Sequence, residues 1–326
     1  MRAGSGLPPA LLAAIDAMLE GTPRKGLAER AARTSLAYRA GHGSSGVIRD
    51  ADDALAYALT RLPATYAACA AVFAEAARVA PAFAPASLLD AGVGPGAASW
   101  AALETWPEIA AAAWLDASAP FLALAERLVA QGPATLQGAE VRRADLTGPG
   151  PWPKADLVVA SYALAEIASD RMAAVVEALW AACDGVLALV EPGTTAGFQR
   201  LLSARDQLIA AGATILAPCP HAAACPLASP DWCHFSVRLP RSRDHRLAKG
   251  AEVPFEDEKF AYLIVARPAV PVSAAAARVL ARPRTGKPGI ELKLCAPDGT
   301  LEPRLIGKRD KPGYAAARRL DWGDAL

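Results

Sequence analysis

Short apolar runs alternate with longer helical segments through the middle of the chain, between residues 87 and 266. A strand followed by a helix and then by another strand forms a βαβ unit, and repeated units build a mostly parallel sheet with helices on both faces. The sequence therefore predicts an α/β fold. We expect strands at 87–91, 112–116, 156–161, 185–191 and 260–266, and helices at 97–103, 120–131, 172–182 and 195–211.

The segments on either side of this region have different patterns. The first 84 residues are rich in Ala and Leu, with charges spaced so that each segment keeps one apolar face. They predict helices at 7–19, 26–40, 49–62 and 63–79. Two later segments, rich in Pro, Cys and Arg, interrupt the alternation. We expect a helical region at 1–84, an α/β domain at 85–267 with a Cys-rich insertion at about 217–255, and a basic C-terminal extension at 268–326.

A glycine-rich loop follows the first predicted strand. Gly92, Gly94 and Gly96 occupy alternate positions after Asp90, and glycine lets the backbone turn tightly and approach a ligand closely. Asp116 ends the next predicted strand, where a carboxylate can accept hydrogen bonds from ribose hydroxyls. Asp116 can thus hold a ribose, Asp90 an amino group and Asp145 an adenine edge. The predicted cofactor-binding residues are Asp90, Gly92, Gly94, Gly96, Asp116 and Asp145.

The loop spacing G-x-G-x-G differs from the dinucleotide fingerprint G-x-G-x-x-G. It resembles the loop of the class I S-adenosylmethionine-dependent methyltransferases, in which the loop faces an amino-acid moiety and a sugar. The resemblance implies a Rossmann-like fold that binds S-adenosylmethionine. Residues 160–166 (ASYALAE) lack the Asn/Asp-Pro-Pro-aromatic motif that amine methyltransferases commonly carry after the fourth strand. The sequence therefore identifies no catalytic residue and leaves open whether the chain is an enzyme.

Three of the six cysteines, Cys219, Cys225 and Cys233, lie within fifteen residues, and Cys295 lies further along the chain. The N-terminus lacks the pattern of a secretory signal, so we expect a reducing, cytoplasmic location in which disulfides are rare. Four thiolates can surround a zinc ion or bind the corners of an iron–sulfur cubane. Zinc sites usually use C-x₂₋₄-C pairs, which this chain lacks. The spacing thus favours an iron–sulfur cluster, with zinc as the alternative.

Charge is unevenly distributed along the chain. From Arg238 to the end, 18 Lys and Arg accompany 11 Asp and Glu, whereas the preceding residues include 16 basic and 22 acidic ones. Basic side chains neutralise phosphates and give nucleic acids a salt-dependent, largely sequence-independent affinity. We therefore expect an RNA partner for the C-terminal part. A membrane partner is not expected, because no apolar run approaches the length that spans a membrane. The basic residues concerned are Arg238, Arg241, Arg243, Arg246, Lys249, Arg304, Lys308, Arg309, Lys311, Arg318 and Arg319.

Several segments together resemble the small-ribosomal-subunit methyltransferase-like family, which is shared by bacteria and mitochondria. They are residues 61–67, 89–96 and 190–194, Gly197 with Phe198, the cysteine block at 219–235, and Cys295 with 322–324. The likeness extends from about residue 50 to the end, and the cysteine block is its most specific part. It implies a methyltransferase fold that associates with the small ribosomal subunit and its rRNA, with no DNA partner expected. It also implies a four-iron, four-sulfur cluster on Cys219, Cys225, Cys233 and Cys295.

Three functions fit these patterns. The leading hypothesis is a small ribosomal subunit assembly or translation factor that binds rRNA, S-adenosylmethionine and an iron–sulfur cluster. The second is an active S-adenosylmethionine-dependent rRNA methyltransferase, which the intact loop and Asp116 support. The third is a small-molecule methyltransferase that contains zinc, in which the basic tail is only a solvated surface.

Overall fold

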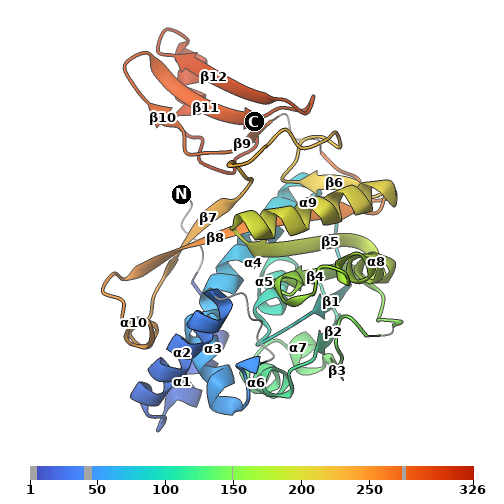
Figure 1. The fold of residues 1–326 in the computed structure, drawn as a ribbon, viewed down its shortest axis with the longest axis vertical. Helices are drawn as coiled ribbons and strands as arrows, with labels where there is room; N and C mark the ends of the chain where they lie inside the picture. Colours follow the sequence, from blue (N-terminus) through green and yellow to red (C-terminus); the bar gives the residue numbers. More distant parts are fainter. Residues whose placement is uncertain (1–5, 40–45, 149, 274–276) are drawn as a thin grey trace.

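A central sheet and a separate smaller sheet organise the molecule (Figure 1). The computed structural model describes residues 6–39, 46–148, 150–273 and 277–326. The central sheet has the strand order β3-β2-β1-β4-β5-β8-β6, and β7 also pairs with β8. Strands β1 to β5 are parallel, whereas β8 is antiparallel to β5, β6 and β7. This arrangement is the class I methyltransferase fold, so the predicted fold class is confirmed.

Side chains along the central strands alternate between two hydrophobic cores. Leu88 and Val159 belong to one core, and Leu89 and Val158 belong to the other, as the two-residue period of a strand requires. Helices therefore cover both faces of the sheet. The strands are β1 (Ser87–Ala91), β2 (Ala111–Asp116), β3 (Glu140–Arg143), β4 (Ala155–Ser161), β5 (Cys183–Pro192), β6 (Thr214–Ala217), β7 (Phe235–Pro240) and β8 (Phe255–Ala266). The helices are α4 (Leu62–Val79), α5 (Ala97–Thr105), α6 (Ala119–Val129) and the short α7 (Ala134–Gln137) on the first core, with α8 (Met172–Ala182) and α9 (Thr195–Ala210) on the second.

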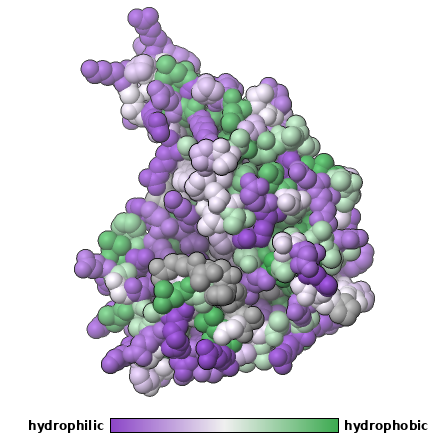
Figure 2. Space-filling view, in the orientation of Figure 1, coloured by the Kyte–Doolittle hydropathy of each residue, from purple (hydrophilic) through white to green (hydrophobic). Residues whose placement is uncertain are grey.

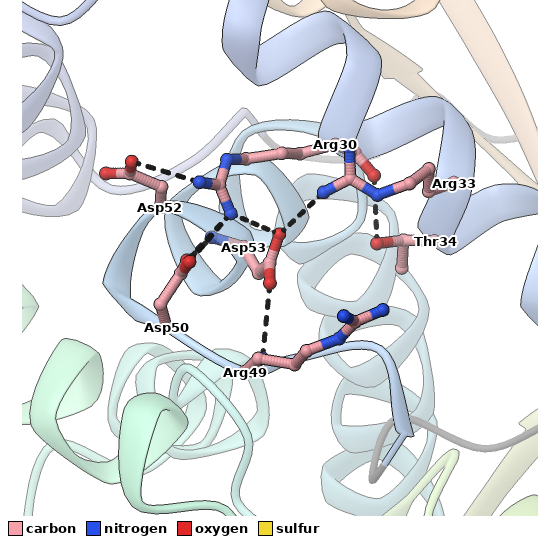
Figure 3. A network of polar contacts seen from close by, with 7 residues as sticks. All are labelled: Arg30, Arg33, Thr34, Arg49, Asp50, Asp52 and Asp53. Atoms are coloured by element: carbon pink, nitrogen blue, oxygen red, sulfur yellow. Dashed lines mark hydrogen bonds and ion pairs between the residues drawn. The ribbon is translucent and has the colours of Figure 1, made fainter.

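The N-terminal helices are α1 (Pro9–Leu19), α2 (Arg24–Arg39) and α3 (Ala51–Thr60), and a network of ion pairs joins α2 to the start of α3 (Figure 3). Arg30 of α2 lies 2.6 Å from the Asp53 carboxylate and 2.8 Å from that of Asp50. Asp50 also caps α3 by accepting a 2.8 Å hydrogen bond from the Asp53 backbone N–H. A carboxylate that is nearly buried, as Asp53 is, is stable only with such partners. The network thus joins α2 to α3, and Tyr57 of α3 packs against the first hydrophobic core, where its ring lies 4.9 Å from that of Phe121 in α6.

The predicted strands and helices are present, with boundaries that differ by a few residues. The last residue of the predicted helix at 26–40, Ala40, lies outside the described residues. The sequence did not predict β3, β6 or β7, or the first residues of β8. Strand β7 comes from the expected insertion at 217–255, yet it pairs with β8 inside the central sheet. The short helix α10 (Arg243–Lys249) connects these two strands and packs against α2 and α3.

The C-terminal extension forms a second sheet with its own small core. Val279, Ile290, Leu292 and Leu294 fill this core together with Ala317 from the final helix. In Figure 1 this sheet lies next to the segment that links β6 to β7. No helix in the described parts of the chain is both long and apolar enough to cross a membrane. The elements of the extension are β9 (Arg278–Val279), β10 (Arg284–Thr285), β11 (Gly289–Cys295), β12 (Leu301–Gly307) and α11 (Lys311–Ala317).

Candidate functional sites

The first candidate site is a pocket at the carboxyl ends of β1, β2 and β4, which is where open α/β sheets bind ligands. Four of the predicted cofactor residues line it, namely Gly92, Gly94, Asp116 and Asp145. The adjacent ends of parallel strands bring these residues together although they are far apart in the sequence. The fold thus brings four of the six predicted residues to the wall of one pocket.

The glycine loop needs its glycines for two physical reasons. Gly92 and Gly94 have φ angles of +78° and +53°, in the left-handed region that other residues rarely adopt. A Cβ atom on Gly92 would also lie 2.6 Å from the Cβ of Ala163. The loop is therefore packed tightly against the chain that follows β4, and a side chain at Gly92 would push the two apart.

Asp116 is held by the loop that it faces. Its Oδ2 accepts a 2.8 Å hydrogen bond from the Gly94 backbone N–H, and its Oδ1 accepts one of 2.8 Å from Ser118. Burial raises the pKa of Asp116, whereas these backbone donors oppose the rise. A carboxylate oxygen can accept more than one hydrogen bond, so the oxygens can still receive ribose hydroxyls.

Asp90 and Gly96 were also predicted to bind the cofactor, and the structure places both away from the lining of the pocket. Asp90 is fully buried, and its Oδ2 accepts a 2.7 Å hydrogen bond from the Ser99 hydroxyl. Ser99 in turn accepts a 3.0 Å hydrogen bond from the Trp114 indole. Burial raises the pKa of Asp90 to about 7. Gly96 caps α5.

Two tyrosines that the sequence did not single out, Tyr57 and Tyr162, also line this pocket. Tyr162 has a φ of +59°, a strained conformation for a non-glycine residue. Its hydroxyl donates a 2.8 Å hydrogen bond to Glu258, which also pairs with Arg61 at 3.2 Å. The buried contact aims the tyrosine hydroxyl at Glu258, and the side chain forms part of the pocket wall. No local sequence signal marks either tyrosine, because only the fold brings them to this place.

The lining of the pocket favours a positively charged ligand. Asp116, Asp145 and Glu166 contribute carboxyl groups, and Arg143 is the basic residue in the described lining. Carboxylates repel phosphates and attract cations. The pocket therefore suits a molecule with a sulfonium or an ammonium group better than a nucleotide with a pyrophosphate.

The second candidate site is a pocket between the central domain and the C-terminal sheet, lined by Cys219, Cys225, Cys233 and Cys295. Three of these cysteines lie in the segment between β6 and β7, and Cys295 ends β11. The remaining cysteines, Cys69 and Cys183, are buried elsewhere in the two cores. The structure thus brings together the four cysteines that were predicted to share one centre.

The thiols are in an environment that disfavours free thiolates. Burial raises the pKa of Cys219 and Cys233, and it raises that of Cys295 to about 12. The other three thiols raise the pKa of Cys233 further, because neighbouring negative charges repel one another. A bound metal would remove this penalty by replacing the protons.

Two buried arginines line the same pocket. Arg205 of α9 is 3% exposed, and Arg278 of β9 is 1% exposed. Arg278 Nε donates a 2.8 Å hydrogen bond to the Pro218 carbonyl, and its guanidinium lies 2.6 Å from the Glu75 carboxylate. Arg205 Nη2 donates to the carbonyl of Ala223 at 2.7 Å, within the cysteine segment. These residues bind the cysteine segment to both neighbouring units and place positive charge beside the thiols.

The donors around the pocket do not converge on a single point. In the described parts of the chain, no group of three or more His, Cys, Asp or Glu side chains is placed to hold one metal ion. His221 Nε2 lies 3.2 Å from the Cys295 sulfur. His234 stacks on Trp232 with a centroid distance of 4.8 Å. The histidines thus flank the cysteines, and the four thiols surround a shared space.

Comparison with known proteins gives two sequence matches. The profile of the family described as mitochondrial small ribosomal subunit Rsm22 matches residues 51–326. The human mitochondrial ribosome assembly protein METTL17 is 32% identical over 294 residues, which is 83% of this chain and 62% of the human protein. The chain therefore spans less than two thirds of that relative.

Solved methyltransferase structures resemble the chain more distantly. Magnesium protoporphyrin IX methyltransferase from Synechocystis PCC 6803 is 16% identical, with a TM-score of 0.40, over 63% of this chain and 83% of that one. Precorrin-6y C5,15-methyltransferase from Geobacter metallireducens is 15% identical, with a TM-score of 0.39, over 61% of this chain and 86% of that one.

Proposed function

Because the chain belongs to the Rsm22 family, we propose that it assists the assembly of the small ribosomal subunit by binding rRNA, with a metal–thiolate centre that holds its C-terminal part in place. The observation that carries the proposal is the meeting of four cysteines at one pocket between the central domain and the second sheet. Family membership supports the ribosomal role, and the human relative is by its name a ribosome assembly protein.

The residues of the cysteine pocket fit a four-iron, four-sulfur cluster. Thiolates are the ligands such clusters use, and the four cysteines that line the pocket lack the C-x₂₋₄-C spacing that zinc sites usually have. Four thiolates carry more negative charge than the core they bind, so the complete centre is an anion. A buried anion needs nearby cations, and Arg205 and Arg278 supply them. The Arg205 Nε is buried with no hydrogen-bond partner, so it is a donor available to a sulfur acceptor.

The metal centre would stabilise the fold by linking the cysteine segment to the second sheet. Cys219, Cys225 and Cys233 come from an irregular segment, and Cys295 comes from the second sheet, whose own core is small. Binding one centre adds folding free energy that so few buried side chains cannot supply. A bound cluster would cross-link these two parts of the chain. Zinc at the same thiols remains the alternative.

The first pocket is proposed to bind S-adenosylmethionine. The left-handed glycines, Asp116 and the excess of carboxylates support a ligand with a ribose and a positive charge. A second function, methyl transfer to rRNA, follows if the bound cofactor is reactive. The glycine loop and Asp116 at the pocket support this candidate, and labelled methyl transfer to immature and mature small-subunit RNA tests it. Absence of incorporation by cluster-loaded protein would rule it out.

Sedimentation of the full chain in a sucrose gradient tests the proposed function. We expect it to travel with free or immature small ribosomal subunits, with large subunits as the control that should not retain it. Recovery only in the ribosome-free fractions would contradict the proposal.

A further inference from the structure

Two groups of basic residues in the C-terminal part differ in their pairing, and we call them the neutralised group and the free group. In the neutralised group, Arg238 pairs with Asp257 at 2.7 Å, and Lys249 and Arg241 pair with Glu256 at 2.7 and 3.2 Å. These pairs lie between β7, α10 and β8, and α10 packs against the N-terminal helices. Each of these three cations therefore already has an acidic partner inside the molecule, and Arg241 and Lys249 share one.

The free group lies at one end of the second sheet, and we call it the cationic end: Arg284, Lys287, Lys308, Arg309 and Lys311. All five residues are exposed, and none makes an ion pair with another described residue. The segments that contribute them, 284–291 and 307–311, hold two acidic residues, Glu291 and Asp310. The Asp310 carboxylate accepts a hydrogen bond from the Gly313 backbone N–H, where it caps α11.

Strand pairing brings the members of the cationic end together. Gly289 of β11 lies opposite Gly307 of β12, and the Lys308 backbone N–H donates a 3.4 Å hydrogen bond to the Pro288 carbonyl. The turn that carries Lys287 therefore lies beside the turn that carries Lys308 and Arg309. Figure 2 shows the second sheet projecting from the body of the molecule, with hydrophilic residues over its outer end. The cations thus form one accessible cluster on a protruding edge.

We propose that the cationic end is the surface through which the chain binds the phosphate backbone of rRNA. This inference rests on the proposed function and refines it, because it assigns RNA binding to five residues at one end of the second sheet and not to the paired residues Arg238, Arg241 and Lys249. Charge complementarity carries the choice of partner: each unpaired Lys or Arg can neutralise one phosphate and release its counterions. A centre that braces the second sheet would also position this surface.

The test measures the binding of the full chain to deproteinised 16S rRNA over a series of KCl concentrations. The variant K308A/R309A/K311A should bind at least about tenfold more weakly at about 100 mM salt. The slope of log K against log salt should become shallower by about 2 to 3, one step for each lost contact. The matched control K25A/R127A/R171A removes three exposed cations outside the second sheet, none of which forms an ion pair with another described residue, and should change the affinity by less than about twofold. A K308R/K311R variant keeps the charge and should keep the affinity.

The assignment would be overturned if K308A/R309A/K311A had the same RNA affinity and the same salt slope of log K as the wild type, with an unchanged unfolding midpoint. An equal loss in the control variant would do the same. If the wild-type chain still sediments with small subunits, the proposed function survives such a result, whereas no RNA binding by the wild-type chain counts against both. Binding to vesicles of phosphatidylglycerol and phosphatidylcholine, with no binding to RNA, would assign the surface to a membrane and also overturn the proposal.

Discussion

Replacement of Arg205 by Met removes a buried positive charge from the cysteine pocket and keeps a side chain of similar length. Arg205 Nη2 donates hydrogen bonds to the carbonyls of His221 at 3.0 Å and of Ala223 at 2.7 Å. Both acceptors lie between Cys219 and Cys225, so the arginine holds the loop that carries two of the proposed ligands. Methionine can fill the space but offers neither a donor nor a charge.

The expected cost differs between the metal-free and the loaded protein. Hydrogen bonds from a charged donor contribute about 1.5–3 kcal/mol each, but the Ala223 backbone is exposed and its carbonyl can regain water. We therefore expect a loss of about 2 kcal/mol of unfolding free energy without the centre. Removing one partner of a buried charge pair costs about 3–5 kcal/mol, so the loaded protein should lose about 3 kcal/mol more. That difference corresponds to a centre that is held about a hundredfold less tightly.

Urea unfolding of the loaded and the metal-free forms, under anaerobic conditions, measures both losses, and competition with a chelator measures retention of the centre. The control variant is R200M, because Arg200 also lies on α9 and pairs with the buried Glu191 at 2.6 Å but does not line the cysteine pocket. R200M should lose stability equally in both forms. The reasoning is refuted if R205M retains the centre as well as the wild type, or if its loss of stability is the same with and without the centre.

Three other predictions concern the cofactor pocket, the buried Asp90 and the metal centre. D116N should weaken S-adenosylmethionine binding by about tenfold or more in calorimetry, because it removes a charge that faces the pocket, and an effect equal to that of the exposed control D184N would contradict this role. Burial raises the pKa of Asp90 to about 7. The contribution of the protonated carboxyl to the free energy of unfolding is therefore fully present below about pH 4 and is lost as the pH rises through about 7. D90N should therefore become more stable relative to the wild type between about pH 5 and pH 8, and an unchanged difference in unfolding free energy would count against this burial effect. Removal of the metal centre should speed amide hydrogen exchange in β9 to β12 and leave β1 and β4 protected, whereas uniform protection would show that the centre does not brace the second sheet.

The central sheet could be predicted because its strands are nearly continuous apolar runs, as in β4 and β5. Strands with polar residues were missed for the same reason. The first half of β8, Phe255 to Lys259, contains three consecutive acidic residues, and one of them, Glu256, is held by ion pairs with Arg241, which follows β7, and with Lys249 of α10. The strand at 289–295 alternates apolar with charged residues, a two-residue period that predicts a half-buried strand. That signal was present in the sequence but was outweighed by the surrounding Pro and Arg.

The candidate sites show a similar division. Clustering along the chain was sufficient to predict Cys219, Cys225 and Cys233 as partners. Cys295 was predicted as the fourth thiolate with no local signal to place it beside the others, because its approach depends on the pairing of the second sheet. Asp90 was predicted to face the cofactor because it precedes the glycines. A strand alternates its side chains between two faces, and local sequence does not say which face holds the ligand. Here Asp90 points to Ser99 in the core, and residues from other strands, such as Tyr162, complete the wall.

Analysis of iron and acid-labile sulfide after anaerobic purification tests the central claim most directly. With four cysteines around one iron–sulfur centre, the wild-type chain should contain about four irons and about four sulfides. C295S should lose most of both, although Cys295 lies far from the other three along the sequence, and C69A should lose neither. Zinc without sulfide in the wild type, or full iron content in C295S, would contradict the account.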